Sequence, residues 1–243
     1  MSRQRPVGEV PVWIPIMLAI SLLIQIAFKV GARPDMPAAE DLPPPPRTEM
    51  LRVAALGETA TVGRLAMIYL QSFDYHGSNA LPYRSLDYGR LIGWLQSIQH
   101  IDPLNEYPLF AAARIYAEVP DPERQRMILE FIFTEYQSDP NRRWQWAAQA
   151  ALVAKHRLKD LPLALKYAGA IERLTTASNV PLWAKQMSVF ILEDMNEFEA
   201  ARIMLGGLLS SGKVIDEEER QFLEGRLKML EVRSGIESNN RRN

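Results

Sequence analysis

The sequence predicts an all-α protein in which one N-terminal transmembrane helix precedes a solenoid of helical hairpins. Three observations support this fold class. Residues 10–30 form a long apolar run, and apolar residues then recur every three or four positions over most of the chain. The helices that this spacing predicts repeat with a period in the mid-thirties. No stretch alternates between apolar and polar residues for long enough to predict a strand.

The apolar run from Val10 to Val30 carries no charged side chain up to Phe28. A helix of this length spans about 30 Å, the thickness of the hydrocarbon core of a bilayer. Trp13 lies near one end, where an aromatic ring suits the membrane interface, and basic residues flank both ends. We therefore expect a single transmembrane helix over residues 10–30, in contact with the lipid bilayer. A cleaved signal peptide is the alternative, with its cleavage site near residues 30–32.

Four further segments complete the predicted organisation. Residues 1–9 form a short N-terminal tail, and residues 234–243 a flexible polar tail. Residues 31–47 form a proline-rich linker in which the run 43–46 predicts an extended polyproline segment. This run is interpreted as a stiff spacer, and recognition by a proline-binding groove is the alternative. Residues 48–233 form the helical repeat domain.

Charge and composition exclude several classes of function. The formal net charge of −1 gives no bulk electrostatic basis for binding nucleic acid. The absence of cysteine excludes disulfides, thiolate zinc sites and cysteine nucleophiles. The short basic N-terminal tail favours an N-terminus inside the cell and a C-terminal domain outside the cytoplasm. For a bacterial protein, this predicts an inner-membrane location with the C-terminal domain in the periplasm. The sequence does not determine the oligomeric state.

The predicted helices form pairs, and comparable positions recur in the second helix of each pair. The first of these positions are separated by 37, 35 and 37 residues. The aligned positions are Leu91, Leu95 and Ile98; Ile128, Ile132 and Glu135; Leu163, Tyr167 and Ala170; and Ala200, Met204 and Gly207. Because one helical pair cannot bury both of its apolar faces, this repeat length predicts a stacked solenoid.

These positions resemble the second helix of the tetratricopeptide repeat, which carries a small residue, a large one four positions later and another small one three positions after that. Proline often follows such a unit, as Pro103 and Pro140 do here. The resemblance covers residues 87–209 and is degenerate, since the Trp, Leu-Gly and Tyr of the family's first helix are mostly missing. It implies a right-handed superhelix whose concave groove binds a protein or peptide.

Basic and aromatic residues cluster on one predicted first helix, the type that the resemblance places along the groove. They are Arg142, Arg143, Trp144, Trp146, Lys155 and Arg157. Arginine beside tryptophan is a favoured anchor at protein interfaces. We interpret these residues as a binding site for an acidic or C-terminal peptide segment. The alternative is that the tryptophans belong to the core and the bases are solvated.

The sequence contains no motif for catalysis, for a cofactor or for a metal ion. Asp74 and His76 lie in an irregular aromatic-rich segment, residues 74–87, but two residues without a third ligand do not specify a metal site. The other histidines, His100 and His156, lie far away in the sequence.

The sequence therefore predicts a membrane-anchored scaffold or adaptor without enzymatic activity. We expect it to bind a protein partner through its repeat groove, within a cell-envelope or membrane-protein assembly. One alternative is a structural accessory subunit of a membrane complex, held by its transmembrane helix. The other is an envelope enzyme built on a helical superhelix, with the 74–87 segment near its centre.

Overall fold

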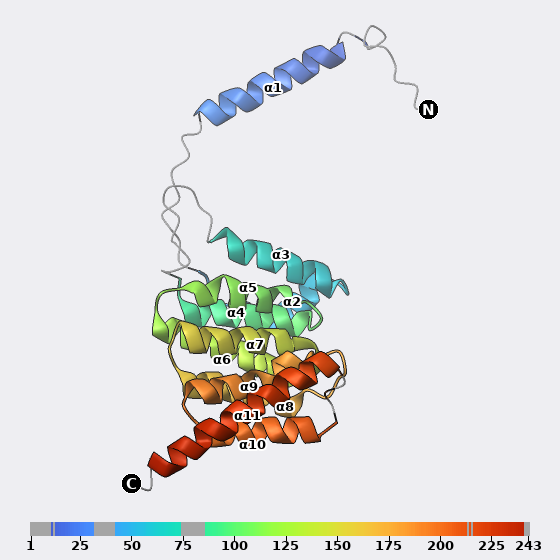
Figure 1. Cartoon of the computed structure of the whole chain (residues 1–243). Helices are drawn as coiled ribbons and strands as arrows, with labels where there is room; N and C mark the ends of the chain where they lie inside the picture. Colours follow the sequence, from blue (N-terminus) through green and yellow to red (C-terminus); the bar gives the residue numbers. More distant parts are fainter. Residues whose placement is uncertain are drawn as a thin grey trace. The chain divides into compact units, whose positions relative to one another are not determined.

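The computed structural model describes residues 11, 13–31, 42–73, 86–212, 214 and 216–240. The chain divides into two compact units, residues 1–40 and 41–243, and the described part of the first is helix α1 with Pro11. The helices are α1 (Trp13–Gly31), α2 (Thr48–Ala55), α3 (Thr59–Ser72), α4 (Tyr88–Ile101), α5 (Tyr107–Arg114), the 3-10 turn η4 (Tyr116–Glu118), α6 (Pro122–Ser138), α7 (Pro140–His156), α8 (Leu161–Leu174), α9 (Leu182–Asp194), α10 (Phe198–Ser210) and α11 (Glu217–Asn240) (Figure 1).

Helix α1 begins at Trp13, later than the apolar run from which it was predicted. Its uncharged part, from Trp13 to Phe28, is about 24 Å long and therefore shorter than a hydrocarbon core of about 30 Å. Of the helices formed by the described residues, none has the length and apolar character needed to cross a membrane. The prediction of a transmembrane helix over residues 10–30 is therefore wrong. Three further predictions depended on this helix and are overturned by the same finding. They are the single-pass class, the location in a bacterial inner membrane and the periplasmic C-terminal domain.

The helices of the second unit stack in chain order, from α2 and α3 at one end to α10 and α11 at the other (Figure 1). Each helix packs against the next one in the sequence. Contacts also join α5 to α7 and α7 to α9, as well as α2 to α4 and α4 to α6. First and second helices therefore form two layers, and the pairs α3–α4, α5–α6, α7–α8 and α9–α10 coincide with the hairpins predicted from the sequence.

The predicted repeat positions form the core in most of the hairpins. Those of α4 and α6 are buried, including Glu135, and those of α8 are buried or partly buried. In α10 the buried residues are Ala201 and Leu205, whereas Ala200 and Met204 are only partly buried. The repeat register of α10 is therefore one residue later than predicted.

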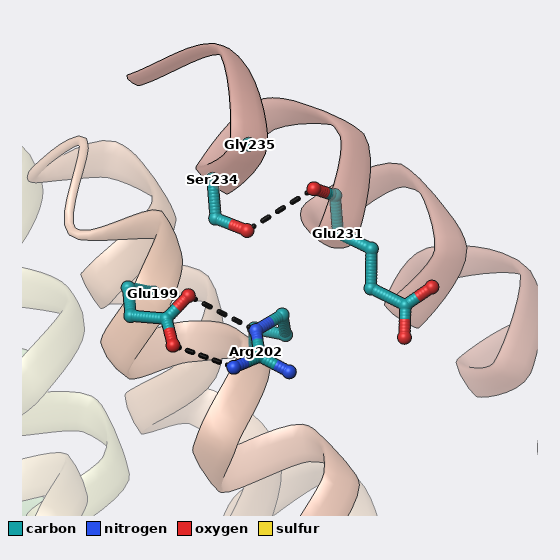
Figure 2. Close-up of a pocket in the computed structure, with 5 residues that line it drawn as sticks. All are labelled: Glu199, Arg202, Glu231, Ser234 and Gly235. Atoms are coloured by element: carbon teal, nitrogen blue, oxygen red, sulfur yellow. Dashed lines mark hydrogen bonds and ion pairs between the residues drawn. The ribbon is translucent and has the colours of Figure 1, made fainter. Parts of the chain in front are cut away.

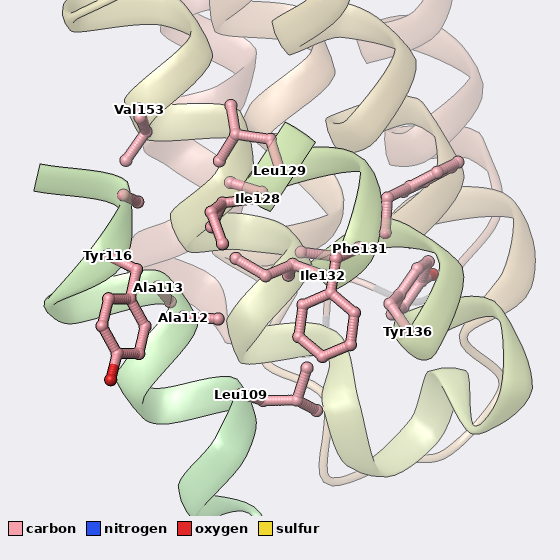
Figure 3. Packing of buried hydrophobic residues seen from close by; sticks show 14 of the residues in the cluster. Leu109, Ala112, Ala113, Tyr116, Ile128, Leu129, Phe131, Ile132, Tyr136 and Val153 are labelled. Atoms are coloured by element: carbon pink, nitrogen blue, oxygen red, sulfur yellow. The ribbon is translucent and has the colours of Figure 1, made fainter. Parts of the chain in front are cut away.

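Small residues let neighbouring helices of the stack approach closely. Figure 3 shows Leu109 and Ala112 of α5 lying opposite Phe131 and Ile132 of α6. The alanines of α5 and α7 at such contacts are all buried, namely Ala111, Ala112, Ala113, Ala147, Ala148, Ala150 and Ala151. Each fully buried large aliphatic side chain contributes about 1.5–3 kcal/mol to the core.

Polar contacts join residues that are one repeat apart. The hydroxyl of Tyr136 donates to the carbonyl of Ala170 at 2.9 Å, and burial raises the pKa of Tyr136 to about 12. Asn141 Oδ1 accepts from the backbone N–H of Thr176 at 2.8 Å and of Ala177 at 2.9 Å. These pairs are separated by 34, 35 and 36 residues, in agreement with the predicted period.

Helix α11 closes the C-terminal end of the stack. Leu223 and Leu230 join Ala201 and Leu205 in a second, smaller core cluster. The helix continues to Asn240, so most of the segment predicted as a flexible tail, residues 234–243, is helical. Its first turn carries three glutamates, which favour the positive end of a helix dipole.

The proline-rich segment also differs from its prediction where the structure describes it. Leu42 is fully buried, and Leu42 to Pro46 lies against α4. This part of the predicted 31–47 linker is therefore packed on the repeat domain and is not a spacer. Residues 32–41 and the predicted tail 1–9 lie outside the described residues.

Candidate functional site

Helix α7 and the residue that follows it carry all six predicted binding residues. Proline at its N-terminus starts the helix, because a missing backbone N–H costs nothing in the first turn. One side of α7 packs on α6 and α8, and neighbouring contacts join it to α5 and α9. The helix therefore has only a narrow face left for a partner.

Arg143 is part of the core and not of a binding surface. It is only 3% exposed, and its Nη1 lies 2.8 Å from the carboxylate of Glu135. The same nitrogen donates to the carbonyl of Glu135 and to Ser138 Oγ, and Nη2 donates to the carbonyl of Pro103 at 3.0 Å. Glu135 occupies a repeat position that the tetratricopeptide pattern gives to a small residue. The buried ion pair explains how an acid is accommodated there.

The other predicted cations also form ion pairs. Arg142 Nε lies 2.9 Å from Asp139 Oδ2, and its Nη2 donates to the carbonyl of Pro103. Lys155 pairs with Asp194 at the end of α9. Arg157 pairs with Glu118 in η4. All four bases thus hold neighbouring segments together. None of them is free to bind the predicted acidic segment.

The two tryptophans of α7 contact exposed aromatic residues of the adjacent first helices. The ring centroid of Trp146 is 6.1 Å from that of Phe110 on α5, in an edge-to-face arrangement. Trp144 contacts Trp183 of α9 in the same way at 5.5 Å. Phe110 also stacks on Tyr107 at 5.8 Å. We call these five residues the aromatic row.

The aromatic row is open to solvent at three places. Tyr107 is 42% exposed, Phe110 40% and Trp183 51%, whereas Trp144 and Trp146 are half-buried. Sequence reasoning missed Tyr107, Phe110 and Trp183. A signal was present, because Phe110, Trp146 and Trp183 are separated by 36 and 37 residues, the same period as the core positions.

The predicted loop and histidines do not form a reactive cluster in the described part of the chain. Residues 74–85, with Asp74 and His76, lie outside the described residues. Asp87 is the N-cap of α4, and its side chain accepts from the backbone N–H groups of Gly89 and Arg90. The described residues contain no group of three or more potential metal ligands.

A shallow pocket of about 510 Å³ lies between α10 and α11. Figure 2 shows Glu199 and Arg202 of α10 facing Glu231 and Ser234 of α11. Arg202 donates to both carboxylate oxygens of Glu199, at 3.0 and 2.5 Å. This pairing lowers the pKa of the Glu199 carboxyl and raises the pKa of the Arg202 guanidinium. Both groups therefore stay charged at neutral pH and are already paired, which suits a surface ion pair and not acid–base chemistry.

Comparison of the chain with protein-family models, with curated proteins and with solved structures found no match.

Proposed function

We propose that the protein is a helical-repeat scaffold of tetratricopeptide-like organisation, without enzymatic activity, that binds a partner polypeptide on the aromatic row. The observation that carries the proposal is the exposure of Tyr107, Phe110 and Trp183 along the layer of first helices. Tyrosine and tryptophan dominate the energetics of protein interfaces because they bury a large area at a low cost in side-chain entropy.

The surroundings of the row favour an apolar segment as the partner. Around α7, Gln145 and Gln149 lie between the two tryptophans, and Leu152 extends the same face at 41% exposure. The cations of α7 and Arg157 are paired with acids, as described above. Gln145 also donates to the carboxylate of Glu106 at 2.6 Å. A face of rings and amides binds apolar side chains and backbone groups, and the paired cations of α7 are not free to select an acidic peptide.

The proposal is tested by photocrosslinking in cells that express the full-length chain. A photoreactive amino acid is placed at Phe110, at Trp183 or, as a control, at Met127 of α6, which is 38% exposed. We expect one dominant protein adduct from the first two positions and none from the third. The same adduct from all three positions, or no adduct from any, would overturn the proposal.

The adduct is then identified and its affinity measured with purified proteins by calorimetry. We expect Trp183→Ala to weaken binding about 30-fold, the effect of losing an interface anchor worth about 2 kcal/mol. Met127→Ala should leave the affinity unchanged. Equal effects of the two variants would place the partner away from the aromatic row.

A further inference from the structure

A short proline-rich segment of the chain occupies a site on helix α4. The segment, Leu42 to Pro46, precedes α2 and is called the proline strap. Each proline ring fixes φ near −65° and pushes the preceding residue into an extended conformation, so four successive prolines form a polyproline II helix. Arg47 continues this conformation with φ −66° and ψ 137°.

Three side chains of α4 donate hydrogen bonds to the backbone of the strap. The bonds run from Arg90 Nη1 to the carbonyl of Leu42 (2.7 Å), from Trp94 Nε1 to that of Pro43 (2.9 Å) and from Ser97 Oγ to that of Pro46 (3.0 Å). The three donors are spaced by four and three residues, which places them on one face of the helix. They contact backbone atoms only and therefore do not depend on the side chains of the ligand.

The shape of the site also fits proline rings. A Cβ atom on Gly93 would lie 2.7 Å from Cγ and 3.2 Å from Cβ of Pro45, so the strap can approach α4 this closely only because residue 93 is glycine. The ring of Tyr69 on α3 lies 5.4 Å from that of Trp94. Leu42 is fully buried and anchors one end of the strap, while Pro44 and Pro45 remain exposed.

These features match the chemistry that a polyproline II helix requires. Such a helix has no internal hydrogen bonds, and its prolines offer carbonyl acceptors but no donors. A site for it must supply side-chain donors together with an aromatic surface for the rings. The face of α4 supplies three donors, one of them the indole N–H of Trp94, and a glycine-lined contact for the ring of Pro45, and it already holds a ligand of this class.

We propose that this face of α4 is a polyproline-binding site, and that its own strap can be exchanged for a proline-rich segment of a partner protein. The site is separate from the aromatic row and adds a second class of ligand to the proposed scaffold. The strap acts as a tethered competitor, so a partner binds only when its segment outcompetes the strap.

The test uses the full-length protein with ¹⁵N-labelled tryptophan, and the indole N–H signal of Trp94 is assigned from a Trp94→Phe variant. The probe is a capped synthetic peptide with this chain's sequence from Leu42 to Arg47. The strap is loosened by Pro44→Gly together with Pro45→Gly, because both prolines are exposed and their loss leaves the core intact. We expect the peptide to shift the Trp94 signal in this variant.

Three comparisons distinguish the polyproline site from ordinary packing. In the parent protein the tethered strap has an effective concentration on the order of millimolar, so the peptide should bind at least about tenfold more weakly than in the loosened variant. Adding Gly93→Ala to the loosened variant should also weaken binding at least about tenfold, since the new methyl group fills the space of the Pro45 ring, and alanine suits the helix. A peptide with alanine in place of all four prolines should not compete.

Leu42→Asp provides a second loosened variant, because a carboxylate cannot remain in the buried position of Leu42. If neither variant binds the peptide while circular dichroism shows a native helix content, the strap is ordinary packing and the proposal is wrong. Equal binding of the alanine peptide also contradicts it. If instead the parent forms a dimer that Pro44→Gly with Pro45→Gly abolishes, the exchangeable strap belongs to a second copy and the partner proposal fails.

Discussion

The cations and the tryptophans of α7 lie on one helix but have different surroundings. Arg143 is buried against Glu135, and Lys155 reaches Asp194 at the end of α9. Trp144 and Trp146 contact rings that are themselves exposed to solvent. Long charged side chains can reach the neighbouring segments and are used to join them, whereas the aromatic rings leave part of their area open. Around α7 the exposed side chains of the proposed binding site are therefore aromatic, whereas the four predicted cations are already paired.

The burial of Arg143 should have the largest energetic effect in this comparison. We expect Arg143→Ala to lower the free energy of unfolding by about 3–5 kcal/mol, because Glu135 would remain buried without its partner. Urea denaturation measures this change. The matched control is Arg126→Ala, whose ion pair with Asp160 is exposed and should be worth about 0–1 kcal/mol.

A double variant separates the charge from the packing. Glu135→Leu with Arg143→Met removes both charges at similar volume and should recover most of the lost stability. If Arg143→Ala instead changes stability by no more than the Arg126 control and abolishes binding of the partner, Arg143 is a recognition residue. The distinction between cations and tryptophans would then be wrong.

Phe110→Ala should have the next largest effect, and the effect should be on binding. The side chain is 40% exposed and touches Trp146 and Tyr107. We expect a loss of partner affinity of about 30-fold, corresponding to about 2 kcal/mol, with a smaller change in unfolding free energy. Calorimetry and urea denaturation of the same variant measure the two quantities. A larger loss of stability than of binding energy would identify the ring as a packing residue.

Asp160 forms an exposed contact between two hairpins, and the contribution of this contact to stability should depend on pH. The backbone N–H of Leu163 and the guanidinium of Arg126 hold the pKa of Asp160 below its ordinary value of 3.8. The pKa of Asp160 is lower in the folded state than in the unfolded state. The ionised carboxylate therefore stabilises the fold at pH values above the unfolded-state pKa. This contribution is lost as the pH falls through the folded-state pKa.

Asp160→Ala should therefore cost about 1 kcal/mol at pH 7, the usual value of an N-cap. The difference between parent and variant should shrink as the pH is lowered below 3.8. Denaturation curves from pH 7 to strongly acidic solution measure this difference. A gap that stays constant over the whole range would show that the charge of Asp160 has no role.

The smallest effect should come from Arg157, the residue that follows α7. Arg157 pairs with Glu118 while both side chains remain exposed to solvent. We expect Arg157→Ala to change the unfolding free energy by about 0–1 kcal/mol and to leave partner affinity unchanged. A tenfold loss of affinity with unaltered stability would show that Arg157 belongs to the binding site.

The apolar periodicity of the sequence predicts the hairpins well, because burial in a helix depends on local spacing that a single chain displays. This periodicity does not predict the burial of Arg143, because arginine side chains are normally exposed. Its burial is possible only because Glu135 lies on the facing helix. The α10 register is missed for a similar reason. Ala200 and Ala201 are adjacent and equally small, so the sequence does not determine which one faces the core.

The aromatic row and the strap show two further limits of sequence reasoning. The period that relates Phe110, Trp146 and Trp183 is present in the sequence, but exposure is decided by neighbouring helices. A run of prolines predicts its own conformation and says little about what it touches. The contact with Trp94 depends on tertiary structure, which explains why the spacer interpretation did not hold for Leu42 to Pro46.

The contacts between residues about 35 positions apart have a consequence for how the protein is made. Each hairpin finds its partner groups in the next stretch of chain, as the Tyr136–Ala170 and Asn141–Thr176 bonds illustrate. Low sequence separation of contacts favours rapid folding. A ribosome adds roughly 5–20 residues per second, so one hairpin emerges every few seconds and can dock before the following one appears. The stack can therefore grow from its N-terminal end during translation, and α11, synthesised last, covers the apolar edge that each earlier hairpin leaves exposed in turn.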